Sequence, residues 1–187
     1  MEVIATAIPD VCLVRPKRHG DPRGWFSEVW NRQRFAEAGL DFDWMQDNQS
    51  LSGPAGTLRG LHFQTPPFAQ TKLVRVLAGA ILDVAVDLRR GSPWFGRHVA
   101  VELSAGQPDQ ILIPRGFAHG FVTLKPNTQV LYKVDAPYAP DHDAGIAWND
   151  PDLAIAWPVG PENVHLSDKD RRQPAWRELP DAFSWSE

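Results

Sequence analysis

Short segments in which apolar and polar residues alternate recur along the chain, and turns rich in proline and glycine separate them. Side chains of a β-strand point alternately to its two faces, so a period of two predicts strands buried on one side. The 17 prolines and 14 glycines end such segments, because proline cannot donate to a strand ladder and glycine suits tight turns. The predicted strands are Thr71–Ala78, Ile81–Leu88, His98–Leu103, Gln110–Ile113 and Thr128–Val134. The pattern therefore predicts an all-β sandwich or barrel.

Two short helices are expected beside these strands. Residues 31–38 have helical spacing, with Asn31 as a candidate cap and Gly39 after the last turn. A second helix can begin after Ser167, whose hydroxyl is suited to cap a turn over residues 168–170.

Length and composition indicate one domain. At 187 residues, with 43% hydrophobic and 22% charged residues, the chain can bury a core and enclose a pocket. No repeat or linker divides it, so residues 1–187 are expected to form one unit. The tail, residues 174–187, carries Trp176, Phe183 and Trp185, and is expected to dock on the body or on a partner chain.

The same sequence disfavours several classes of protein. The longest apolar run, residues 76–82, ends at Asp83, and the amino terminus lacks a basic region, so neither a membrane span nor a signal peptide is expected. Cys12 is the only cysteine, which favours a reducing, cytoplasmic location and a role as a small core residue. A net charge of -4 argues against nucleic-acid binding. An anionic ligand would need a few individually placed cations.

A single imidazole, His62, lies in the middle of a short apolar strand pattern, between Leu61 and Phe63. Arg59 precedes it and Lys72 follows soon after. Burial or a neighbouring carboxylate easily moves the pKa of a histidine across neutral pH. His62 is therefore a candidate base for proton transfer.

Two further polar residues have structural interpretations that spacing alone favours. Alternation places Asp83 on the smaller-residue face of its strand, where it can orient a histidine or simply be satisfied by backbone donors. Tyr132 shares a strand face with Val130 and Val134, and its hydroxyl can deliver a proton or hydrogen-bond within a core. The chain has only two tyrosines beside nine Phe and eight Trp. Because Phe and Trp serve at most aromatic positions, a tyrosine at position 132 is consistent with a specific need for its hydroxyl.

The run Pro114–Phe121 contains Pro-x-Gly-x-x-His, the later half of the cupin signature, which ends here at His119. Many cupins bind a metal through this histidine together with an earlier His-x-His and a downstream Glu. The matching place here reads His62-Phe63-Gln64, and no Glu occurs between His62 and Gly79. Two histidines make a poor four-ligand site, so metal-free chemistry is expected.

Seven segments in order resemble the dTDP-4-dehydrorhamnose 3,5-epimerase family, from near the amino terminus to about Asp170. They are Gly20–Glu28, Gln46–Asn48, Arg59–Gln64, Lys72–Arg75, Asp83–Arg89, Pro114–Phe121 and Leu131–Lys133. The resemblance implies a cupin-type jelly roll with short peripheral helices and a homodimer. It also implies that the substrate is a dTDP-linked 4-keto-6-deoxy sugar, inverted at carbons 3 and 5 without metal or organic cofactor.

The resemblance also implies roles for individual residues. His62 matches the base that removes the proton beside the ketone, and Asp170 matches its carboxylate partner. Lys72 matches the residue that stabilises the enolate oxygen, and Tyr132 matches the acid on the opposite face of the sugar. Without the resemblance, Asp170 would be interpreted as a surface acid on a helical turn.

Other positions match substrate contacts of the family. Tyr138 matches the aromatic residue that stacks on thymine, and Asp143 stands where the family commonly has Glu. The remaining matches, besides Lys72, are Arg23, Glu28, Gln46, Asp47, Asn48, Arg59, His119 and Lys169. Arg59 and His62 have opposite parity in a regular strand, so both can face the substrate only with a bulge, for example at Gly60, or across a subunit boundary.

Three alternatives remain open at this point. A relative on the same scaffold can invert one carbon only, or isomerise the ketone. A metal-dependent cupin oxygenase would contain stoichiometric iron. A non-catalytic sugar-nucleotide binding module would bind dTDP without exchanging the protons of the sugar.

Overall fold

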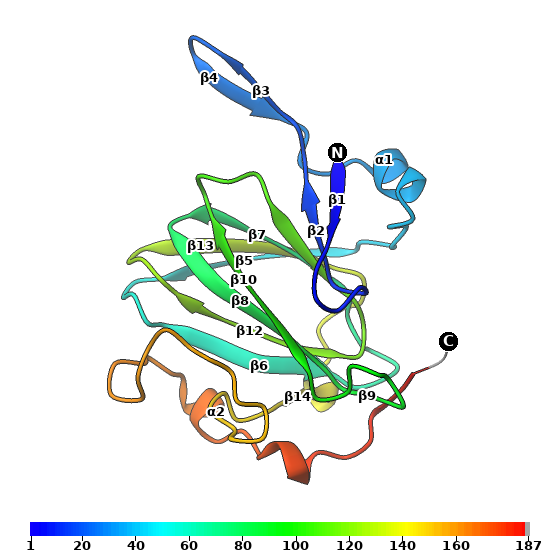
Figure 1. The fold of residues 1–187 in the computed structure, drawn as a ribbon, viewed down its shortest axis with the longest axis vertical. Coiled ribbons are helices and arrows are strands. Elements are labelled where there is room, and N and C mark those ends of the chain that lie inside the picture. Colours follow the sequence, from blue (N-terminus) through cyan, green and yellow to red (C-terminus); the bar gives the residue numbers. More distant parts are fainter. Residues whose placement is uncertain (186–187) are drawn as a thin grey trace.

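A computed structural model describes residues 1–185, and most of its strands form two antiparallel sheets that face each other (Figure 1). The larger sheet has the strand order β1-β2-β11-β7-β13-β5, and the smaller sheet has the order β10-β8-β12-β6-β14. The strands of the larger sheet are β1 (Glu2–Ala5), β2 (Cys12–Arg15), β5 (Gln46–Ser52), β7 (Lys72–Ala78), β11 (Gln110–Ile113) and β13 (Thr128–Val134). Those of the smaller sheet are β6 (Leu58–Gln64), β8 (Ala80–Asp87), β10 (His98–Ser104), β12 (Phe117–Thr123) and β14 (Asp143–Gly145). The predicted all-β cupin-type jelly roll is confirmed.

Small elements surround the two sheets. They are the hairpin β3 (Arg18–Asp21) and β4 (Gly24–Ser27), the pair β9 (Arg89–Arg90) and β15 (Phe183–Ser184), the helices α1 (Arg32–Glu37) and α2 (Asp168–Arg171), and the 3-10 turns η1 (Pro140–His142) and η2 (Trp176–Glu178). Within residues 1–185, helices are too short and too polar to cross a bilayer.

All five predicted strands are present, with ends shifted by no more than one residue. The short strands β3 and β4 were not predicted, because their sequences lack apolar alternation. Both predicted helices are present with their expected caps. Asn31 accepts the amide of Arg34 at 3.1 Å, and Ser167 accepts the amide of Asp170 at 3.1 Å.

The main core lies between the two sheets and comes from alternate residues of facing strands. Val74, Val130, Ile81 and Ala85 all belong to it. The opposite face of β8 packs under the carboxyl-terminal segment in a second cluster. The smaller sheet is thus covered on both faces, which fixes the positions of the side chains that it directs inward.

Residues of the tail cover the outer face of the smaller sheet. β15 pairs in parallel with β9, and the rings of Phe63 and Phe183 lie 6.0 Å apart. Trp176 packs on Phe95 with ring centroids 5.1 Å apart. Residues 186–187 of the expected tail lie outside the described residues.

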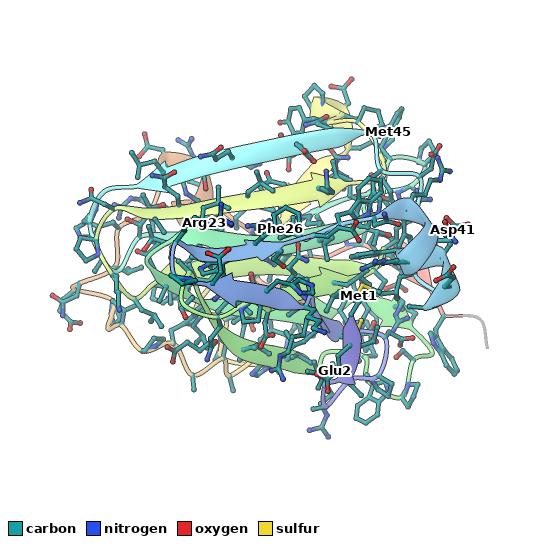
Figure 2. The ribbon with its side chains drawn as sticks, turned by 90° about the horizontal axis from the view of Figure 1, so that it is seen from above. Met1, Glu2, Arg23, Phe26, Asp41 and Met45 are labelled. Carbon is teal, nitrogen blue, oxygen red and sulfur yellow. The ribbon has the colours of Figure 1, made fainter. Side chains whose placement is uncertain are left out.

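The β3–β4 hairpin projects away from the sandwich (Figure 1). Arg23 and Phe26 lie along it (Figure 2). Trp25 and Phe26 are 55% and 71% exposed, although most large aromatic side chains are at least partly buried in globular proteins.

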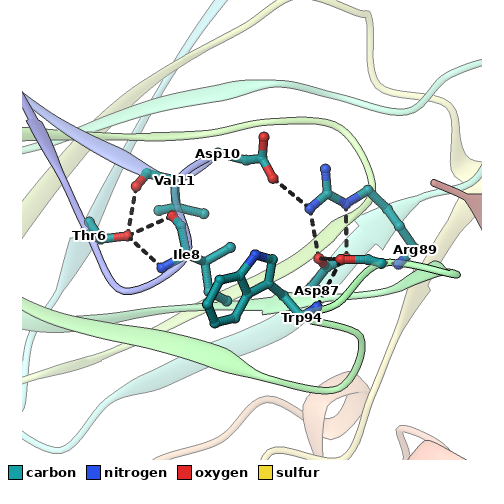
Figure 3. A network of polar contacts seen from close by, with 8 residues as sticks. Thr6, Ile8, Asp10, Val11, Asp87, Arg89 and Trp94 are labelled. Carbon is teal, nitrogen blue, oxygen red and sulfur yellow. Dashed lines mark hydrogen bonds and ion pairs between the residues drawn. The ribbon is translucent and has the colours of Figure 1, made fainter. Parts of the chain in front are cut away.

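An ion-pair network centred on the buried Asp87 joins the amino-terminal loop to the end of β8. Figure 3 shows Arg89 between Asp87 and Asp10, with Nη2 2.7 Å and 2.9 Å from the two carboxylates. Asp87 is fully buried and also accepts the Ser92 hydroxyl at 2.7 Å. The guanidinium lies 4.6 Å from the ring centroid of Phe117, the first residue of β12. This network therefore anchors the start of the strand that carries His119.

Candidate active site

The candidate site is centred on two adjacent strands of the smaller sheet, β6 and β12. His62 pairs directly with His119, and Arg59 pairs with Phe121, so β6 has one more residue than β12 over this stretch. The extra residue is accommodated at Gly60, which has φ +138° and backbone that closely approaches Gly120. The bulge predicted at Gly60 is thus confirmed, and it turns Arg59 and His62 to the same, inner face.

His62 is paired with Asp170, which α2 brings to it from far along the chain. Nε2 of His62 lies 2.5 Å from Oδ1 of Asp170, and the Ser167 hydroxyl donates to Oδ2 at 2.9 Å. Burial alone would raise the pKa of Asp170, but the hydrogen bonds and charges of His62, with help from Ser167 and Lys169, lower it. Asp170 is therefore held as a carboxylate that can stabilise an imidazolium.

A second histidine–carboxylate pair lies beside the first. Nε2 of His119 is 2.9 Å from Oδ2 of Asp83, and Asp83 is fully buried. Its other oxygen has no hydrogen-bond partner within residues 1–185. Burial lowers the pKa of His119, against the attraction of Asp83. In the described part of the chain, no three His, Cys, Asp or Glu side chains are grouped as a metal site would require.

Lys72 enters the same space from β7, in the opposing sheet. It shares the inward parity of Val74 and Val76, which lie in the main core. Burial lowers the pKa of Lys72 from 10.5 to about 8, although the charges of Asp83 and Asp143 act to raise it. An ammonium held in a poorly solvated site exerts a strong field on any nearby developing charge.

Tyr132 is directed inward from β13, the strand that pairs with β7 in the larger sheet. It packs against the main core and pairs across the ladder with Asn48 of β5. Burial raises the pKa of Tyr132, so the phenol keeps its proton at neutral pH. The amide of Gln46 donates to Asn48 at 2.8 Å, which places both amides on the inner face of β5.

A cluster at the rim is centred on Asp143, at the start of β14. Oδ2 of Asp143 accepts the Tyr138 hydroxyl at 2.9 Å and forms an ion pair with Lys169 of α2. Tyr138 is 58% exposed, so one face of its ring remains accessible to a planar group. The shorter Asp in place of Glu therefore still contacts both neighbours.

Arg59 borders an open pocket of about 320 Å³ that Asp170 and Ser167 also line. Its guanidinium donates to the Ser52 hydroxyl at 3.2 Å and to the Leu51 carbonyl at 3.3 Å. These two bonds leave further N–H donors of the guanidinium for an anion.

Three predicted contact residues lie away from this cluster within one chain. Asp47 points to the outer face of β5, where Lys133 contacts it at 2.8 Å. Arg23, at the tip of the hairpin, pairs with Asp21 at 2.6 Å, and Glu28 pairs with Arg34 at 3.2 Å.

The contact between Ser167 and Asp170 was not predicted, because Ser167 was interpreted only as a helix cap. The spacing Ser-x-x-Asp is the signal that indicates such a contact, since a capping residue and the third helical residue lie side by side. The whole arrangement places an imidazole and a phenol on opposing sheets, with an ammonium in the same interior. Such a site can take a proton from one side of a small molecule and return one from the other.

Comparison with known proteins gives a consistent result. The family model described as dTDP-4-dehydrorhamnose 3,5-epimerase matches residues 5–178. The dTDP-4-dehydrorhamnose 3,5-epimerase of Sinorhizobium fredii is 51% identical over 179 residues, which cover 96% of this chain and 91% of that protein.

Two crystal structures resemble the fold closely. The dTDP-4-dehydrorhamnose 3,5-epimerase of Bacillus anthracis with TDP and PPi bound has a TM-score of 0.90 at 51% identity, covering 93% of this chain and 98% of that one. The dTDP-6-deoxy-D-glucose-3,5-epimerase of Legionella pneumophila in complex with dTDP-4-keto-L-rhamnose has a TM-score of 0.94 at 41% identity, covering 100% and 99%.

Proposed function

Because the chain belongs to the dTDP-4-dehydrorhamnose 3,5-epimerase family, we propose that it inverts carbons 3 and 5 of dTDP-4-dehydro-6-deoxy-D-glucose. The product is dTDP-4-dehydro-L-rhamnose, on the route to dTDP-L-rhamnose. The 4-keto group acidifies the hydrogens on both carbons, so one base and one acid can serve twice. The hydrogen bond between His62 and Asp170, with Tyr132 on the opposing sheet, is the observation that carries this proposal.

Proton removal begins at His62. Since Asp170 occupies Nε2, Nδ1 is the nitrogen that takes the proton from the carbon next to the ketone. The electron pair of the broken C–H bond forms the enolate double bond, and the ketone oxygen becomes negative. The ammonium of Lys72 stabilises that oxygen, and the Asp170 carboxylate stabilises the imidazolium.

Proton return completes the inversion. The Tyr132 hydroxyl gives its proton to the opposite face of the same carbon, the enolate electrons form the new C–H bond, and the ketone is restored. His62 and the phenolate regain their starting states by proton exchange with solvent. The second carbon is then inverted in the same way.

Several contacts hold the nucleotide and the sugar. Arg59 binds the diphosphate, because a guanidinium donates two parallel hydrogen bonds to phosphate oxygens. The exposed ring of Tyr138 stacks on thymine, while Asp143 and Lys169 lie at the same rim. The sugar is held by the side chains of His119, Gln46 and Asn48.

The active unit is a homodimer in the cytoplasm. Arg23 and Glu28 lie outside the cluster around His62 within one chain, and the hairpin beside them exposes Trp25 and Phe26. A second copy that covers these rings would bring Arg23 and Glu28 to the partner's pocket. Asp47 makes no direct contact with the sugar nucleotide in its own chain's pocket, because its carboxylate pairs with Lys133 of β13 on the outer face of the larger sheet.

Deuterium incorporation tests the proposed reaction. In deuterated water, NMR of the product should show deuterium at carbons 3 and 5, and His62→Asn should abolish exchange at both. His98→Asn, on β10, is the matched control and should exchange normally. Deuterium at one carbon only would indicate a mono-epimerase. Deuterium at neither carbon would contradict the proposed reaction and indicate a non-catalytic module that binds the sugar nucleotide. Stoichiometric iron in the purified protein would contradict the metal-free mechanism.

A further inference from the structure

Both oxygens of the Asp170 carboxylate are hydrogen-bonded, and they bond to residues of different segments. Oδ1 contacts Nε2 of His62 at 2.5 Å, and Oδ2 accepts the hydroxyl of Ser167 at 2.9 Å. The oxygen of the same hydroxyl accepts the Asp170 amide at 3.1 Å and so caps α2. One hydroxyl group therefore links the side chain of Asp170 to its own backbone.

A carboxylate on such a short helix needs this restraint to keep a fixed orientation. α2 spans only Asp168–Arg171, and one helical turn has little stability of its own. The terminal torsion of an Asp side chain has a broad energy well, so Oδ1 can turn away from His62 when Oδ2 is unrestrained. With the Ser167 hydroxyl on Oδ2, the other oxygen is directed at the imidazole.

Within the described residues, no charged side chain takes the place of the Ser167 hydroxyl in holding Oδ2 of Asp170. His62 and Lys169 are the charged groups that influence the ionisation of Asp170. The ammonium of Lys169 forms its ion pair with Asp143 rather than with Asp170. Ser167 is thus the only side chain in residues 1–185 that holds Oδ2.

We infer that Ser167 is a positioning residue for proton transfer, which acts by fixing the Asp170 carboxylate against His62. This inference rests on the proposed function, because it requires His62 to be the base. Ser167 contacts Asp170 and not the base itself, so its removal affects the stabilisation of the imidazolium in the transition state. Substrate binding, which depends on other residues, stays nearly unchanged.

Steady-state kinetics of Ser167→Ala provide the first test. The expected result is a kcat lowered about tenfold, as for loss of one hydrogen bond to a charged group. KM should change less than about twofold. A wild-type kcat in this variant would overturn the inference.

Proton NMR of the free protein provides the second test and does not depend on turnover. The proton in the short His62–Asp170 hydrogen bond should give a strongly downfield signal, assigned by its loss in His62→Asn. Ser167→Ala should weaken this signal or shift it upfield, and an unchanged signal would contradict the inference. If the wild-type protein shows the signal but exchanges no deuterium into substrate, the proposed function fails instead.

Two further variants separate carboxylate positioning from helix capping. Ser167→Thr keeps a hydroxyl that can both donate and accept, so it should restore kcat and the downfield signal. Ser167→Gly is tolerated at a helix cap at a cost of only a few tenths of a kcal/mol, yet it cannot donate, and it should behave like Ser167→Ala. Recovery in the glycine variant, or failure of the threonine variant to recover, would overturn the inference.

Discussion

Arg59 and His62 lie on the same face of β6, although three residues apart they should face opposite sides of a regular strand. Their partners on β12, Phe121 and His119, are two residues apart and face inward together. The bulge at Gly60 accommodates the difference. A guanidinium suited to an anion and an imidazole suited to proton transfer are thereby directed to the same, inner side of the smaller sheet.

Gly60→Ala should damage both the fold and the site. A Cβ at Gly60 would lie 2.5 Å from the Cα of Gly120 and 3.0 Å from the carbonyl oxygen of His119, and φ is +138°. Backbone cannot give way as a flexible side chain can, so the free energy of unfolding should fall by about 2–5 kcal/mol. Urea denaturation measures this loss, and enzymatic activity should fall with it.

The matched control for the backbone strain is Gly24→Ala. Gly24 has φ +135°, but a Cβ there would meet no atom of residues 1–185 within 4 Å beyond its chain neighbours. Its cost should be smaller by at least about 1 kcal/mol, because overpacking is absent. Equal losses in the two variants would show that the close approach to Gly120 does not matter.

Sequence patterns predicted the parts of this site that depend on local alternation. The inward facing of Tyr132 with Val130 follows from strand parity. The bulge at Gly60 follows from strand parity only once the family resemblance requires Arg59 and His62 to share a face. Long-range placement has no local signal, and only the family resemblance paired Asp170 with His62 across 108 positions. Alternation along β5 also directs Asp47 to the opposite face from its neighbours Gln46 and Asn48. Because the three residues are consecutive in the family motif, the resemblance did not reveal this difference.

Activity should decline as pH rises through about 8, because Lys72 then loses its proton. The fold lowers the pKa of Lys72 to about 8, and only the protonated form stabilises the enolate oxygen. The pH profile of kcat/KM for the wild-type enzyme should therefore have a basic limb in this region. Lys72→Met should lower kcat at every pH and lose this limb.

Asp83→Asn should move that basic limb to lower pH. The negative charge of Asp83 raises the pKa of Lys72 against the effect of burial, so its removal lets the ammonium lose its proton earlier. An unchanged limb in Asp83→Asn would assign the ionisation to a group other than Lys72.

Arg89→Met should destabilise the protein strongly, although Arg89 is not itself a residue of the proposed active site. Asp87 is fully buried, and Arg89 supplies its charged partner from Nε and Nη2. Removal of one partner from a buried pair leaves an uncompensated charge, at a cost of about 3–5 kcal/mol. Chemical denaturation measures this loss in the free energy of unfolding.

Asp10→Asn is the control for this prediction. The carboxylate of Asp10 is 45% exposed, so its replacement should lower the free energy of unfolding by less than about 1 kcal/mol. A loss as large as that of Arg89→Met would place the main anchor at Asp10 instead.

Mixed dimers should reveal which chain supplies Arg23 to each pocket. Arg23→Ala and His62→Asn should each be nearly inactive alone, the first through weaker binding and the second through loss of the base. If Arg23 reaches the partner's pocket, a mixed dimer contains one pocket with both residues intact and one with neither. Coexpression with random pairing should then restore about a quarter of the wild-type activity, since half of the dimers are mixed. If Arg23 serves its own chain, every pocket in the mixture carries one defect, and activity measured after coexpression should not exceed that of the separate variants.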